Sequence, residues 1–87
     1  MDKNRRKGTM YNLYFVKPKE NADACRIAEK LMELKSVKEV LLTEGDCGFI
    51  VKAKFIDGKE PVEVANYISK NISGRYGKAV SHYEYRK

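Results

Sequence analysis

The chain has 87 residues, of which 43% are hydrophobic and 34% charged, and eighteen Lys and Arg against twelve Asp and Glu give a net charge of +6. This length supports one compact domain but not two, and no apolar stretch approaches the ~20 residues of a membrane helix. The hydrophobic fraction is too high for an intrinsically disordered chain. We therefore expect one folded domain without a membrane partner. A cytoplasmic location is expected, because no apolar targeting segment opens the sequence.

Half of the net charge lies at the start of the chain. Residues 1–8 hold four of the basic residues and one acid. Such a segment is typical of a solvated end, so we predict a basic flexible tail over residues 1–8 and a single domain over residues 9–87. The remaining excess of three positive charges is typical of an ordinary protein surface rather than of a dedicated nucleic-acid footprint.

The first half of the chain predicts a strand, a helix and a second strand. Residues 10–17 are rich in aromatic and branched side chains and stop before Pro18, which favours a strand. Asn21 is the expected helix N-cap, and apolar residues then recur at helical spacing from Ala24 to Leu34, with Cys25 expected as a small buried thiol. Residues 37–43 follow as a strand.

The second half predicts a strand, a helix and a last strand. Residues 44–48 contain two glycines and lead into the alternating segment 49–55, so a hairpin is expected. Pro61 suits the first turn of a helix whose apolar stripe would consist of Val62, Ala65, Ile68 and Ile72. Gly74 and Gly77 should end this helix, and residues 79–86 alternate as a final strand.

This order of elements predicts an α+β fold, the ferredoxin-like βαββαβ sandwich, in which two helices cover one face of a four-stranded antiparallel sheet. The other sheet face would stay open. We expect Leu13, Phe15, Phe49, Val51 and Phe55, or their immediate neighbours, to face the helices. The residues expected on the open face are Tyr14, Val16, Leu41 and Ile50. An apolar face of this kind predicts a partner, most simply a second copy in a homodimer.

Catalytic and metal-binding patterns are missing from the sequence. His82 is the single histidine, and the two cysteines, Cys25 and Cys47, do not form a zinc-binding spacing. No nucleophile elbow or phosphate loop is present. We therefore predict a protein that is not an enzyme and that uses neither a metal nor a cofactor.

The hairpin resembles the effector-binding domain of the leucine-responsive and asparagine regulators, the Lrp/AsnC family. The likeness covers about residues 11–85. It rests on Val37, Val40, Gly45, Asp46, Ile50, Val51 and Lys52. The resemblance implies a stand-alone ferredoxin-like module that pairs through its sheets and binds an amino acid near the hairpin turn at subunit contacts. Because the helix-turn-helix of these regulators is missing, any effect on transcription would pass through a partner.

The expected ligand-binding residues are Thr43, Glu44, Gly45, Asp46 and Gly48. Glycines let backbone N–H groups approach a carboxylate closely, and Glu44 or Asp46 could hold the ammonium group of an amino acid. The alternative is a turn that needs Gly45 for a positive φ and binds nothing.

Two other functions stay open. The RNA-recognition motif has the same order of elements and stacks bases on aromatic residues of its first and third strands. Segments 13–16 and 48–55 are similar to its two signatures, and in this interpretation Tyr14, Lys52 and Lys54 would contact single-stranded RNA. The chain could also be an assembly module that has no ligand.

Overall fold

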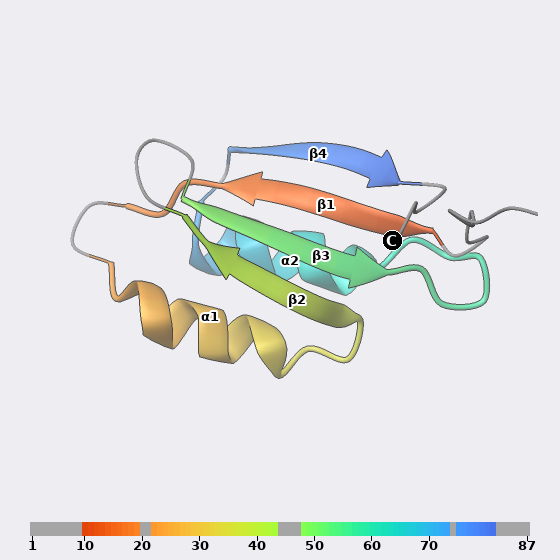
Figure 1. The fold of residues 1–87 in the computed structure, drawn as a ribbon, viewed down its shortest axis with the longest axis horizontal. Helices are drawn as coiled ribbons and strands as arrows, with labels where there is room; N and C mark the ends of the chain where they lie inside the picture. Colours follow the sequence, from red (N-terminus) through yellow and green to blue (C-terminus); the bar gives the residue numbers. More distant parts are fainter. Residues whose placement is uncertain (1–9, 20–21, 44–47, 74, 82–87) are drawn as a thin grey trace, which may run out of the picture.

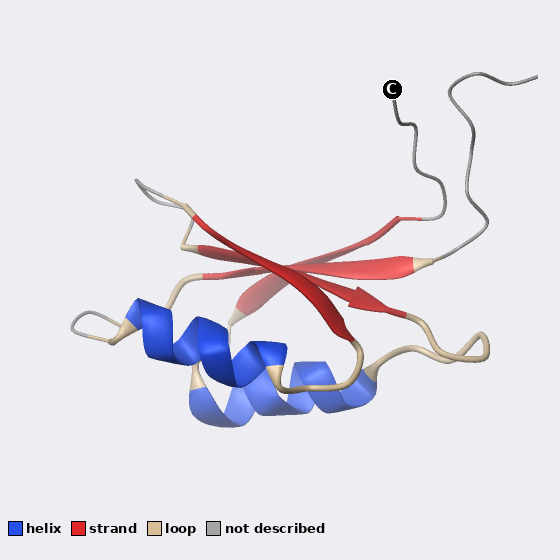
Figure 2. Ribbon diagram, turned by 60° about the horizontal axis from the view of Figure 1, so that its bottom comes forward, coloured by secondary structure: helices blue, strands red, loops and turns tan. Residues whose placement is uncertain are grey.

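The structure of the protein is a computed structural model that describes residues 10–19, 22–43, 48–73 and 75–81. Its elements are β1 (Tyr11–Val16), α1 (Ala24–Met32), β2 (Val37–Leu42), β3 (Phe49–Lys54), α2 (Val62–Asn71) and β4 (Tyr76–Ser81). The four strands form one antiparallel sheet in the order β2-β3-β1-β4, and both helices lie on the same side of it (Figures 1 and 2). The predicted ferredoxin-like sandwich is confirmed. No helix among the described residues has the length and apolarity that crossing a membrane requires.

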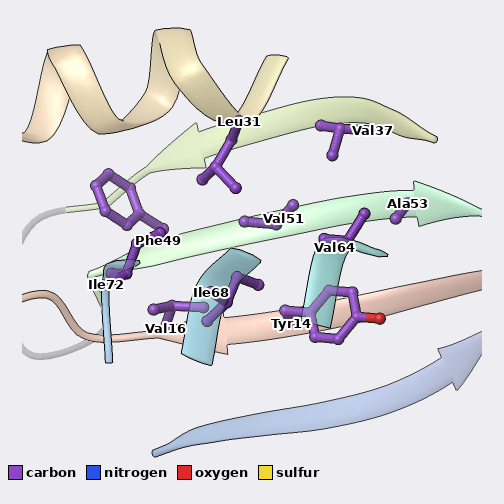
Figure 3. Packing of buried hydrophobic residues seen from close by; sticks show 10 residues of the cluster. All are labelled: Tyr14, Val16, Leu31, Val37, Phe49, Val51, Ala53, Val64, Ile68 and Ile72. Atoms are coloured by element: carbon purple, nitrogen blue, oxygen red, sulfur yellow. The ribbon is translucent and has the colours of Figure 1, made fainter. Parts of the chain in front are cut away.

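The core lies between the helices and the sheet (Figure 3). It consists of Tyr14, Val16, Leu31, Val37, Phe49, Val51, Ala53, Val64, Ile68 and Ile72. Leu31 is the buried residue of α1, whereas Val64 and Ile68 are those of α2. In α2 the predicted stripe is wrong at its first position, because Val62 is 59% exposed and Val64 points to the sheet instead.

The two faces of β1 are reversed from the prediction. Tyr14 and Val16 are fully buried against the helices, while Phe15 is 43% exposed on the open face. Since directly paired residues of neighbouring strands point to the same face, the pairing of Tyr14 with Val51 places both in the core. Apolar side chains occur at odd and even positions of this strand, so its alternation alone does not choose a face.

A β-bulge in β2 explains how two valines three residues apart share one face. Val37 pairs with Ala53 and Val40 with Val51, so both are turned to the helices. The register shifts between Val37 and Glu39, which leaves Lys38 as the extra residue of the bulge. Strict alternation does not predict this.

Several element ends differ from the predictions. The side chain of Asp23 accepts a hydrogen bond from the backbone N–H of Arg26 and caps α1, whereas the expected cap, Asn21, is outside the described residues. Cys25 on α1 is exposed rather than buried. The last strand begins at Tyr76 and includes Gly77, three residues earlier than predicted, and the predicted strand residues 82–86 are outside the described part of the chain.

Candidate functional site: the open sheet face

The open sheet face carries an apolar row at one end. Phe15 on β1, Ile50 on β3 and Leu41 on β2 are directly paired across the three strands, and we call these three residues the apolar row. Phe15 and Leu41 are 43% and 47% exposed, and Figure 2 shows both helices on the opposite side of the sheet. On β4 the partner of Phe15 is Gly77, where an added Cβ would lie 3.6 Å from the Phe15 ring. The ring therefore extends over β4, which has no side chain there.

The other end of the same face is basic and aromatic. Tyr11 pairs with Lys54, and Lys52 pairs with Leu13 one row nearer to the apolar row. The Lys52 ammonium lies 4.3 Å from the centre of the Tyr11 ring, a cation–π distance. We call Tyr11, Lys52 and Lys54 the basic end. The face is thus polarised along its strands, from the apolar row near the 43–48 turn to the basic end.

Some of the residues predicted for the open face lie on it, whereas others are buried. Leu41 and Ile50 lie on the open face as predicted, and so do Lys52 and Lys54. Tyr14 and Val16 do not, because they are buried in the core, so neither is available to a dimer partner in this fold. Tyr14 is also unavailable to stack on an RNA base. Among the described residues, the aromatic side chains on the open face are those of Tyr11 and Phe15.

Of the predicted amino acid site, the structure describes Thr43 and Gly48, whereas Glu44, Gly45 and Asp46 are outside the described residues. The backbone N–H and the hydroxyl of Thr43 both donate to the Gly48 carbonyl oxygen, at 2.9 and 2.5 Å. Gly48 has φ +76°, and a Cβ there would overlap the Val16 carbonyl oxygen. Both residues are therefore explained by closure of the hairpin onto the end of β1.

A polar group buried on the helix side was missed from the sequence. Asn12 is fully buried and its side-chain amide donates to the Tyr14 hydroxyl at 2.9 Å. Burial raises the pKa of the Tyr14 phenol above its ordinary value. The Asn12 Oδ1 has no hydrogen-bond partner among the described residues. The only sequence signal was an asparagine at a position of β1 that shares a face with Tyr14 and Val16.

An ion pair involving the edge strand β4 lies beside Asn12 and Tyr14. Lys78 on β4 donates to the Glu60 carboxylate at 2.6 Å. This hydrogen bond lowers the pKa of Glu60 and raises that of Lys78, as expected for partners that stabilise each other's charged form. The pair is partly exposed, so it orients the chain before α2 more than it stabilises the fold.

The described residues do not include a group of three or more His, Cys, Asp and Glu side chains that could hold a metal ion. No protein-family model matches this chain, and no curated protein matches it either. Its fold is similar to the crystal structure of a hypothetical protein from Pyrococcus horikoshii, with a TM-score of 0.61 and 17% identity over 83% of this chain and 88% of that one. At this identity the likeness shows the fold alone.

Proposed function

We propose that this chain is a non-enzymatic module that self-associates through the apolar row of its open sheet face. The observation that carries this proposal is the direct pairing of Phe15, Ile50 and Leu41 across three neighbouring strands on the face opposite the helices. Contiguous exposed apolar side chains of this kind mark interaction surfaces in folded proteins. The fold itself hosts many functions, so the open face, and not the fold, supports this function.

A second copy suits this face because the row can pair with itself. A twofold axis lying along the apolar row would stack each row on the same row of the partner, as an isologous interface requires. The same axis reverses the strand direction, so the lysines of the two basic ends would lie at opposite extremes of the dimer. An apolar centre with a charged rim is the usual composition of such an interface.

An amino acid effector extends the proposal. The paired strand residues Leu42 and Phe49 lie one position beyond the apolar row. Thr43 directly follows Leu42, and Gly48 directly precedes Phe49. In the arrangement above, Thr43 and Gly48 of each copy would lie beside the sheet of the other. The resemblance to the Lrp/AsnC effector domain supports a ligand at such a contact. An amide NMR titration with pooled amino acids tests it, and a dimer without any shift is an assembly module alone.

Sedimentation equilibrium of the full chain tests self-association. Phe15→Ser and Leu41→Ser should each raise the dimer dissociation constant at least about tenfold, because each removes a large apolar side chain from the interface. Met32→Ser is the matched control, since Met32 is 49% exposed but lies on α1. A wild-type chain that is monomeric at millimolar concentration, or a control that dissociates equally, contradicts the proposal.

Single-stranded RNA is the second candidate partner. Tyr11 and Phe15 share the open face with Lys52 and Lys54, and base stacking on an aromatic residue contributes about 1–3 kcal/mol. Against it, the Lys52 ammonium lies over the Tyr11 ring and competes for that platform. Fluorescence anisotropy with a labelled oligonucleotide distinguishes the two functions. RNA binding that weakens in both Phe15→Ser and Lys54→Gln would favour this candidate.

A further inference from the structure

A hollow of about 290 Å³ lies at the corner of the sheet farthest from the 43–48 turn. It is lined by Lys35, Lys38, Lys54, Phe55, Ile56 and Asp57. These residues come from three places, which are the α1–β2 connection, the beginning of β2 and the segment that ends β3. All three lie on the right of Figure 1. The hollow borders the basic end but not the apolar row.

The backbone brings the three lysines to the same corner. The N–H of Lys54 donates to the Ser36 carbonyl oxygen at 2.8 Å and joins the end of β3 to the loop that carries Lys35. Lys38 is the extra residue of the β-bulge, and bulges commonly re-aim a side chain near binding sites. The opposite wall ends in a tight turn in which Asp57 and Gly58 both have positive φ and Ile56 pairs with Lys59. Backbone hydrogen bonds therefore fix both walls of the hollow.

The charges around the hollow are unbalanced. Three lysines and a single acidic residue, Asp57, line it, and within the described ranges none of the three lysines forms an ion pair. An excess of positive over negative side chains creates a local positive potential that attracts an anion. Beside them, half-buried Phe55 and 40% exposed Ile56 form an apolar wall. The hollow therefore combines a cluster of lysines with an apolar surface.

We propose that this hollow binds a small phosphorylated molecule. Lys35, Lys38 and Lys54 hold the phosphate group, and Phe55 with Ile56 contacts the apolar or planar body of the ligand. A phosphate monoester carries a charge of about −1.5 to −2 and three strong acceptor oxygens at neutral pH. It can therefore accept hydrogen bonds from several lysines at once, more than a ligand with a carboxylate group can. The volume is at the lower limit of ligand pockets, roughly 300 Å³, so a mononucleotide-sized ligand is the upper bound.

This site is independent of the proposed dimer. A twofold axis along the apolar row leaves both basic ends, and the hollows beside them, outside the central contact. Self-association and phosphate binding can therefore be lost separately.

An amide NMR titration of the full chain tests the site with three probes: adenosine 5′-monophosphate, inorganic phosphate and adenosine. The monophosphate should shift the amides of Lys38 and of residues 54–57, phosphate alone should do so more weakly, and adenosine should not. The double variant Lys38→Gln/Lys54→Gln should weaken monophosphate binding at least about tenfold, because charged hydrogen bonds contribute most of the affinity. Lys17→Gln/Lys70→Gln removes the same charge from exposed positions outside the hollow and should bind as the wild type does.

Three results would overturn the proposal. Equal weakening in the control pair would show that net charge alone attracts the anion. A single-stranded RNA that shifts the same amides, when the monophosphate and phosphate do not, would assign the corner to a polymer backbone. The absence of a shift with every probe at low salt, where surface electrostatics is strongest, would exclude the site.

Discussion

Gly48 has a left-handed backbone conformation and also lies in close contact with the end of β1. Its φ of +76° is unfavourable for residues with a Cβ, and such a Cβ would also overlap the carbonyl oxygen of Val16 at the end of β1. Gly58 has nearly the same φ, +74°, but no atom within 4 Å of the position of its missing Cβ. Comparing substitutions at the two glycines therefore separates the free-energy cost of the backbone conformation from that of the steric overlap.

We expect Gly48→Ala to lower the free energy of unfolding by at least about 2 kcal/mol, because left-handed backbone costs about 1–2 kcal/mol and the clash adds to it. Gly58→Ala should cost only the conformational part, about 1–2 kcal/mol. Urea denaturation of both variants in one buffer measures the difference. Equal losses would show that β1 moves away without cost.

Tyr14 makes the stability of the fold depend on pH at the alkaline end. Burial raises its pKa in the folded chain, so the folded state keeps the phenol proton after the unfolded state has lost it. Stability is therefore intact below about pH 10, the ordinary tyrosine pKa, and is lost as the pH rises toward the raised value.

Between these two pKa values the free energy of unfolding should fall by up to about 1.4 kcal/mol per pH unit through this group. Tyr14→Phe should have a shallower alkaline decline, because the other titrating groups are common to both chains. The same variant should be less stable at neutral pH by about 1–3 kcal/mol, since the buried amide of Asn12 loses its acceptor. Chemical denaturation at pH 8 and pH 11 gives both numbers, and parallel pH profiles would contradict the assignment.

At the scale of the elements, β2 shows how one extra residue sets a strand's faces. Without Lys38, Val37 and Val40 would be two positions apart and would share the helix side by ordinary alternation. With it, the same valines face the core only because the strand bulges. The extra residue is useful if it supplies a ligand contact rather than stability.

We expect the chain with Lys38 deleted to fold with an unfolding free energy within about 1 kcal/mol of the wild type, because surface changes outside special features have small effects. Deleting Lys52 from β3 should instead abolish folding, since it moves one half of a central strand to the wrong face. Amide spectra and thermal melts distinguish the two. A Lys38 deletion that unfolds would show that the bulge is required by the α1–β2 connection.

The elements themselves were predictable to different degrees. Both helices and the hairpin follow from apolar spacing and turn residues, which are local signals. The sequence does not predict the beginning of β4, because a glycine such as Gly77 is typical of a helix end. In the structure Gly77 is tolerated in the strand beside the Phe15 ring. Of the candidate amino acid site, Thr43 and Gly48 are accounted for by the hairpin, and the remaining residues stay predictions.

In the fold as a whole, consecutive residues of β1 take part in different interactions. Tyr14 packs between the sheet and α2, whereas Phe15 faces away from both helices. The stability of the monomer should therefore depend on Tyr14, and its assembly on Phe15.

The melting temperature should therefore rise with protein concentration in the wild type, because association stabilises the folded state by mass action. In Phe15→Ser this dependence should disappear, while the melting temperature at low concentration is nearly unchanged. Tyr14→Ala should lower the unfolding free energy by about 3–5 kcal/mol at every concentration, as expected for a large core residue. Calorimetry over a hundredfold concentration range checks this, and a wild-type melting temperature that is constant would contradict self-association.

The order of strands and helices, and with it the ferredoxin-like architecture, follows from local sequence patterns, because periodicity and turn residues act over a few positions and few topologies satisfy that order. Local patterns do not predict which face of β1 is buried, since both faces are apolar and the pairing register with β3 selects one of them. The same holds for Lys35, Lys38 and Lys54, which line one hollow only in the folded chain. Residues far apart in the chain meet through strand pairing, which local patterns do not encode.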